Sequence, residues 1–260
     1  MSRRLILIAA SGLAISVASL SVVHSMTNNL PDEASAALTK FLASKHVTVQ
    51  FDDDQRFGAC PSGATAEDAS PSQRSLTWPS GETELSVSIP AKVHYQPNAP
   101  RGVSATGRAD TLAHLKIENG NITYDCSWTR KGRLDDMMPD VTIGGAEIDT
   151  FSVSGIGKID LADVHQPNLT VKISGTGSVD GTGAADRLDI DISGAGKIDL
   201  GALRAKTAKI HMSGAGEAKL AVIDDAEVHI SGVGRVRWVE TPVHVDSHIS
   251  GVGSVGSIEK

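Results

Sequence analysis

The sequence predicts an all-β protein, a right-handed, single-stranded parallel β-helix of about six coils of 18–20 residues, with a small N-terminal strand and helix region as a cap. Three observations predict this fold. A four-residue motif recurs at a nearly fixed period, and apolar residues alternate with polar ones around every copy. The composition, with 26 Gly but only four Phe, three Trp and two Tyr, suits tight corners and thin layers.

The recurring motif is Ser-Gly-x-Gly, which occurs six times with steps of 20, 19, 20, 18 and 19 residues. A fixed period of this size is typical of a solenoid, in which each copy stacks on the next. We expect the corner glycines to adopt positive φ angles, which side chains with a Cβ avoid. The corner residues are Ser154, Gly155, Gly157, Ser174, Gly175, Gly177, Ser193, Gly194, Gly196, Ser213, Gly214, Gly216, Ser231, Gly232, Gly234, Ser250, Gly251 and Gly253.

Apolar residues flank the motif in register. The residue before the serine is in turn Val153, Ile173, Ile192, Met212, Ile230 and Ile249. The residue three before the serine is apolar in five copies, namely Phe151, Val171, Ile190, Ile210 and Val228, and is Ser247 in the last. Stacking identical strands in parallel turns these columns inward, and the crossover rule makes the winding right-handed. The segments between copies vary, so we expect a third, looser side with Val164, Leu203 and Val222 turned inward.

The first 25 residues have the form of a secretory signal peptide. Arg3 and Arg4 precede an apolar run over 5–23, and Val23 and Ser25 supply the small residues of a cleavage site. An uncleaved membrane anchor is the alternative, whereas no later segment is apolar enough to cross a membrane. After cleavage we therefore expect no stable membrane span.

Residues 26–81 are expected to form an N-terminal segment with a helix at 31–42, a strand at 47–51 and a mobile loop at 58–75. The β-helix domain follows at 82–260, with regular repeats over 150–256. Asn119-Gly120 is a strong hairpin signal, and the charged stretch 130–140 is expected to be a loop. Short strands are expected at 84–90, 93–95, 115–117, 122–124 and 141–143.

Cys60 and Cys126 are the two cysteines of the chain. Because an exported protein folds in an oxidising compartment, we expect them to form a disulfide. Two buried free thiols are the alternative.

The repeat region resembles the GIN-domain family, which is described as the head domain of autotransporter adhesins and consists of parallel β-helices. The resemblance covers about residues 82–256, including the segment Glu82-Thr-Glu-Leu-Ser-Val-Ser-Ile-Pro90, the segment from Ala109 to Tyr124 and all six corners. It implies an exported β-helix with an adhesin-like role, and it brings no catalytic residues.

We expect a non-catalytic scaffold of the bacterial cell envelope that binds a surface polymer or a protein and uses no cofactor. It would be exported to the periplasm or to the cell surface. The net charge of -7 argues against nucleic acid as a partner, because phosphates require a basic footprint. Homo-oligomers could form through the C-terminal coil, because the ends of a solenoid expose strand edges.

Two columns of polar residues offer alternative functions. Asp160, Asp180 and Asp199 recur six residues after the serine, and such a column could serve a carbohydrate lyase or hydrolase. His211, His229 and His248 recur two residues before the serine and could gather a zinc or copper ion. A solvated surface is the simpler explanation of both columns, so we assign no catalytic, cofactor or metal residue.

Overall fold

The computed structural model describes residues 6–9, 47–50, 71–126, 129–132 and 138–258. The predicted signal peptide and the predicted helix at 31–42 therefore lie mostly or wholly outside the described residues. Among the described residues, no helix is long and apolar enough to span a membrane. The strands β1 (Ile6–Ala9), β2 (Val47–Gln50) and β9 (Thr129–Gly132) form a three-stranded sheet, and all the other strands form a 15-stranded sheet.

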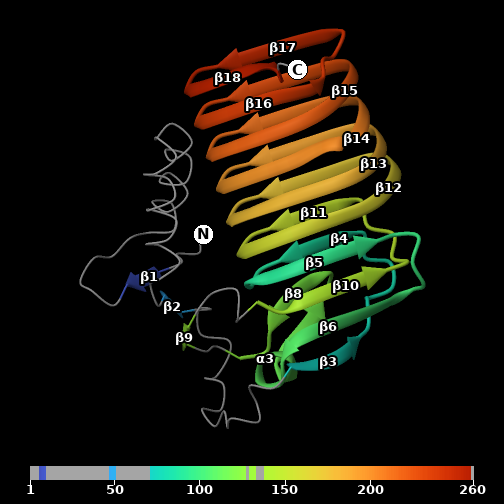
Figure 1. The fold of residues 1–260 in the computed structure, drawn as a ribbon, viewed down its shortest axis with the longest axis vertical. Helices are drawn as coiled ribbons and strands as arrows, with labels where there is room; N and C mark the ends of the chain where they lie inside the picture. The colour runs from blue at the N-terminus through green and yellow to red at the C-terminus, as the bar shows by residue number, and fades with distance from the viewer. Residues whose placement is uncertain (1–5, 10–46, 51–70, 127–128, 133–137, 259–260) are drawn as a thin grey trace.

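The solenoid is built from parallel strands that run from one corner to the next, as Figure 1 shows. It makes about five turns, which confirms the predicted parallel β-helix. Around the corners each residue pairs with its equivalent in the next copy, so that Gly157 lies beside Gly177 and Gly177 beside Gly196. The strands are β11 (Thr150–Val153), β12 (Ile156–Ile173), β13 (Thr176–Ile192), β14 (Ala195–Met212), β15 (Ala215–Ile230), β16 (Val233–Glu240), β17 (His244–Ile249) and β18 (Val252–Ser257).

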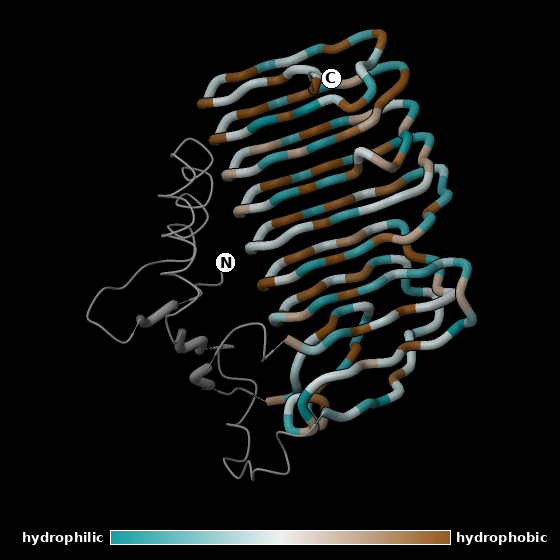
Figure 2. The backbone as a smooth tube through the Cα atoms, in the orientation of Figure 1, coloured by the Kyte–Doolittle hydropathy of each residue, from teal (hydrophilic) through white to brown (hydrophobic). Residues whose placement is uncertain are grey.

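The predicted inward columns form the core. Alternation of apolar and polar residues along each coil is visible in Figure 2, and the apolar set is buried from Phe151 to Trp238. Val164, Leu203 and Val222 are fully buried, as predicted. The third side is more regular than expected, because its backbone also pairs between neighbouring coils. The pairing of β12 with β13 continues along this side and is interrupted there only by a shift in register, between Leu161 and Val164.

The region before residue 150 closes one end of the solenoid. β4 pairs in parallel with β11, and β5 pairs in parallel with both β12 and β10. Beyond them the pairing becomes antiparallel, with β6 against β10 and β3 (Pro71–Leu76), and β7 against β8. These elements are β4 (Glu84–Val87), β5 (Ala91–Gln96), β6 (Gly102–Arg108), α3 (Ala109–Ala113), β7 (Leu115–Glu118), β8 (Asn121–Tyr124) and β10 (Asp140–Gly144).

Several elements of this region differ from the sequence-based expectation. β3 (Pro71–Leu76) falls partly in the predicted mobile loop and extends the sheet before residue 82. β6 and α3 were not predicted, and β9 (Thr129–Gly132) lies partly in the predicted loop at 130–140. β9 pairs with β2 (Val47–Gln50), which in turn pairs with β1 (Ile6–Ala9). The hairpin is confirmed, because Asn119 and Gly120 both have positive φ between β7 and β8.

The corner glycines are needed for a reason other than the one predicted. Among the described residues, the glycines with positive φ are Gly81, Gly120, Gly145 and Gly183, and none of these is a corner glycine. Instead, a Cβ on the first glycine of a corner would overlap the carbonyl oxygen of the equivalent glycine in the preceding coil, as at Gly194 over Gly175. Close backbone approach between stacked coils, rather than an unusual backbone angle, therefore excludes other residues.

Backbone hydrogen bonds draw the corners together. The N–H groups of Ser174 and Gly175 both donate to the carbonyl oxygen of Val153, at 2.9 and 3.0 Å. The second corner glycine makes room inside the coil, since a Cβ on Gly196 would lie 2.7 Å from Cδ1 of Ile173. At Gly177, Gly216 and Gly253 the nearest atom to such a Cβ is instead the carbonyl oxygen of the equivalent glycine in the preceding coil.

We predict that Gly194→Ala lowers the free energy of unfolding by about 1–3 kcal/mol, because the new methyl group is forced against the neighbouring backbone. Gly256→Ala is the matched control, since a Cβ there meets no heavy atom within 4 Å. Urea unfolding of both variants measures the difference. Equal stability of the two variants would contradict the close-approach explanation.

Candidate functional site

One face of the solenoid carries the histidine column, and we call it the histidine face. It consists of the outward residues on the strand segments that end at each corner serine. Three columns run along it in parallel register: Asn168, Arg187, Thr207, Asp225 and His244; Thr170, Asp189, Lys209, Glu227 and Asp246; and Lys172, Asp191, His211, His229 and His248. The inward residues of the same segments hold these columns in place.

A depression of about 380 Å³ opens on this face across the last coils. Ala208 and Ala226 contribute to its lining, and both are almost completely buried. Both alanines belong to an inward column, in which Ala208 pairs with Ala226 and Ala226 with Val245, so the depression lies between the outward side chains that flank them. The polar lining residues are Arg187, Thr207, Lys209, Asp225, Glu227, His244 and Asp246.

The charges around the depression are arranged in pairs. Arg187 donates to Asp189 through Nε and Nη2, at 2.9 and 3.1 Å. Glu227 Oε1 lies 3.1 Å from Nζ of Lys209 and 2.8 Å from Nε2 of His229. Hydrogen bonds from His229 and then Lys209 lower the pKa of Glu227, and the hydrogen bond to Asp189 raises the pKa of Arg187. Both shifts keep these groups charged at neutral pH.

The histidine column does not assemble as a metal site. His229 and His248 stack, with ring centroids 5.4 Å apart and ring planes at 17°, while His211 and His229 are 6.5 Å apart. Stacked rings direct their nitrogens sideways, and Nε2 of His229 is engaged by Glu227. In the described part of the chain, the three histidines do not bring their ligand atoms within 4.8 Å of one another.

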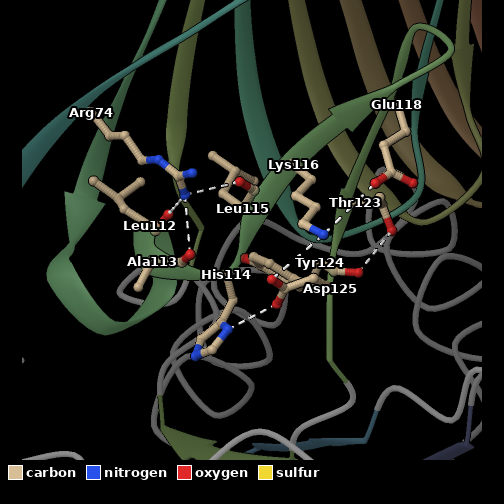
Figure 3. Close-up of polar contacts among 10 residues, drawn as sticks. All are labelled: Arg74, Leu112, Ala113, His114, Leu115, Lys116, Glu118, Thr123, Tyr124 and Asp125. Carbon is tan, nitrogen blue, oxygen red and sulfur yellow. Dashed lines mark hydrogen bonds and ion pairs between the residues drawn. The ribbon is translucent and has the colours of Figure 1, made fainter. Parts of the chain in front are cut away.

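Another group does meet that distance, at the capped end of the solenoid. His114, Asp125 and Cys126 place their ligand atoms within 4.8 Å of one another, and Figure 3 shows His114 facing Asp125. His114 Nδ1 lies 2.8 Å from Asp125 Oδ1, and Nζ of Lys116 lies 3.7 Å from Asp125 Oδ2. The ammonium group on the same carboxylate disfavours a bound cation. Cys60 lies outside the described residues, so the Cys60–Cys126 disulfide stays a prediction.

The aspartate column lies on the adjacent face, where basic groups neutralise it. The register places Asp160 beside Asp180 and Asp180 beside Asp199. Nζ of Lys158 lies 2.9 Å from Asp160 and 3.4 Å from Asp180, and Nζ of Lys219 lies 3.3 Å from Asp199. The hydrogen bond to Asp160 raises the pKa of Lys158. The aspartates of this column are therefore engaged by ammonium groups of the same face.

We predict that Lys209→Met raises the pKa of Glu227 toward its ordinary value, because one of the two hydrogen bonds that favour the carboxylate is lost. Since its pKa is lowered in the folded state, Glu227 stabilises the fold above the ordinary glutamate pKa. This contribution is lost as the pH falls through the folded-state value. NMR titration of the carboxyl carbon measures the change.

Lys206→Met is the matched control for this titration, because Lys206 pairs with Asp186 at 2.6 Å instead of with Glu227. It should leave the titration of Glu227 unchanged. If both variants shifted it equally, general surface charge rather than the hydrogen bond would be responsible.

Comparison with one solved structure supports the fold. The crystal structure of a putative adhesin from Bacteroides fragilis shares 15% identity with a TM-score of 0.54, covering 74% of this chain and 99% of its own. A putative lipid binding protein from Parabacteroides distasonis shares 14% identity with a TM-score of 0.38, covering 73% of this chain and 97% of its own. At 15% identity the likeness to the Bacteroides fragilis structure concerns the fold alone. No curated protein matches the sequence significantly.

The family match covers more than half of the chain. The model of the family described as "Putative auto-transporter adhesin, head GIN domain" matches residues 83–242, which include five of the six corners and the strands that bear most of the depression. The chain therefore belongs to the GIN-domain family of adhesin-head proteins.

Proposed function

We propose that the protein is an exported, adhesin-like binding protein that holds its partner on the histidine face. The depression lined by paired charges is the observation that carries this proposal. The regular columns around it offer hydrogen-bonding groups at the spacing of neighbouring strands, about 4.8 Å, over several coils. Membership of an adhesin-head family supports the same role.

The chemistry of the face favours a polar polymer as the partner. Trp238, which is the tryptophan of the repeat region, is buried and cannot serve as a platform for sugar rings. Recognition would therefore depend on hydrogen bonds and charge. A cell-surface polysaccharide that carries charged groups of both signs fits the alternating Arg187, Lys209 and carboxylate side chains.

Binding without catalysis fits the charge states better than a hydrolase or a lyase does. Lys158, Arg187 and Glu227 all have pKa values shifted in the direction that preserves their ordinary charge. Such groups attract and orient a ligand but are poorly suited to transfer protons at neutral pH. The predicted signal peptide at 1–25 and the family together support export to the periplasm or the cell surface.

We predict that the purified protein retains charged polysaccharides on a glycan array and releases no shortened chains. Arg187→Ala combined with Lys209→Ala should weaken retention about 10-fold or more, since a hydrogen bond to a charged group contributes about 1.5–3 kcal/mol. Lys206→Ala removes an exposed cation that does not line the depression and should leave retention intact.

Product analysis separates this proposal from the enzymatic alternative. Shortened chains that disappear in Asp180→Ala would show that the aspartate column performs chemistry. Retention that survives the Arg187 and Lys209 double variant would place binding on another face.

A further inference from the structure

The last coil of the solenoid has an open edge. β17 pairs with β15 and β18 pairs with β16, and among the described residues neither strand has a partner on its other side. Figure 1 shows these strands at the end opposite α3. The capped end, by contrast, is closed by antiparallel strands. An open edge recruits another strand unless something covers it.

The apolar residues of this coil are exposed where their equivalents are buried. Val245 and Ile249 are each 41% exposed, whereas Ile230, one coil below Ile249, is 1% exposed. Both side chains continue the inward columns, so they form the uncovered top of the core. A partner that covers the edge would bury them and extend the core by one layer.

Ser247 marks the centre of this edge. It replaces the apolar residue that occupies the same inward column in the five preceding copies, and it lies beside Val228 of the coil below. Within the core a serine would lack a partner, but at an interface its hydroxyl can bond to a group from the other side. Its position midway between Val245 and Ile249 suggests a symmetry axis.

We propose that a second copy of this chain covers the edge, with the two β17 strands pairing antiparallel about a two-fold axis at Ser247. In this register Val245 faces Ile249 of the other copy, and Ser247 faces its own equivalent. On the outward side Asp246 faces His248 of the other copy, so that an imidazole N–H can donate to each carboxylate. Every pair across the axis is therefore chemically matched.

Neighbouring registers fail this test. A shift of one residue would set inward residues against outward ones, because side chains alternate along a strand. A two-fold axis at Asp246 would set two aspartates against each other, and one at His248 would set two histidines against each other. Like charges directly opposite destabilise antiparallel pairs. The register centred on Ser247 avoids both of these clashes and matches the two faces of the strand.

The first experiment measures the oligomeric state of the mature chain by sedimentation velocity over a range of concentrations. The wild type should form a dimer. Val245→Lys combined with Ile249→Lys should give a monomer with an unchanged β-type circular dichroism spectrum, because two charges would be buried at the interface. Val239→Lys, at an exposed apolar residue away from the edge, should leave the dimer intact.

The second experiment tests the register by cross-linking. Ser247→Cys should form a disulfide-linked dimer under oxidising conditions, since directly opposed residues of antiparallel strands lie within disulfide distance. Ser254→Cys, on β18, is exposed as well and should stay monomeric on a non-reducing gel. The wild type controls for linkage through its own cysteines.

Three results would overturn the proposal. A wild type that stays monomeric at every concentration would show that no second copy covers the edge. Amides of β17 that are then protected from hydrogen exchange would show that a segment of the same chain or another protein covers it. A dimer that survives the double lysine variant would use another surface. A dimer of the Ser247→Cys variant that does not cross-link would have a different register.

Discussion

Close stacking of identical backbone segments is the constraint on which the rest of the structure depends. At each corner the N–H groups of the serine and the first glycine share one carbonyl oxygen of the preceding coil, which leaves no space for a Cβ between them. Because this contact recurs at every turn, each coil must have the same number of residues between corners. Where the number differs, the extra or missing residues must be accommodated away from the corners. The register shifts on the third side, such as the one between Leu161 and Val164, show where that difference is absorbed.

This constraint separates the residues that build the fold from those that are free to vary. Inward positions require residues that can be buried in the apolar core, although their size varies from Gly181 to Trp238, whereas outward positions need only tolerate a strand. One outward column accordingly runs through Asn168, Arg187, Thr207, Asp225 and His244 without repeating a residue. Outward residues at equivalent positions can therefore differ from coil to coil and together form a binding face, while the backbone of the solenoid stays the same.

The repeated part of the fold could be predicted from the sequence because its information is local and recurs six times. Inward columns, corners and the parallel register all follow from it. The capping strand β6 and helix α3 lack a repeat, so nothing in their sequence marked them. The role of the corner glycines was misjudged because it depends on a contact between coils, which φ preferences do not reveal. Similarly, the spacing of His211, His229 and His248 predicted their alignment but could not predict that His229 and His248 would stack and that His229 would bond to Glu227.

The two ends of the solenoid differ in whether their strand edges are covered, and this difference affects how a partner could bind. Antiparallel strands of the same chain close one end, while the other presents β17. Antiparallel pairing of two β17 strands in the register centred on Ser247 keeps outward residues outward. The histidine faces of two copies would then form one continuous surface with a depression on each side of the axis. Because His244 and Asp246 line the depression and also belong to β17, the two depressions would lie near each other. A polymer that engages one of them would hold its next repeats at high effective concentration beside the other, so that weak polar contacts at each depression combine into firm attachment.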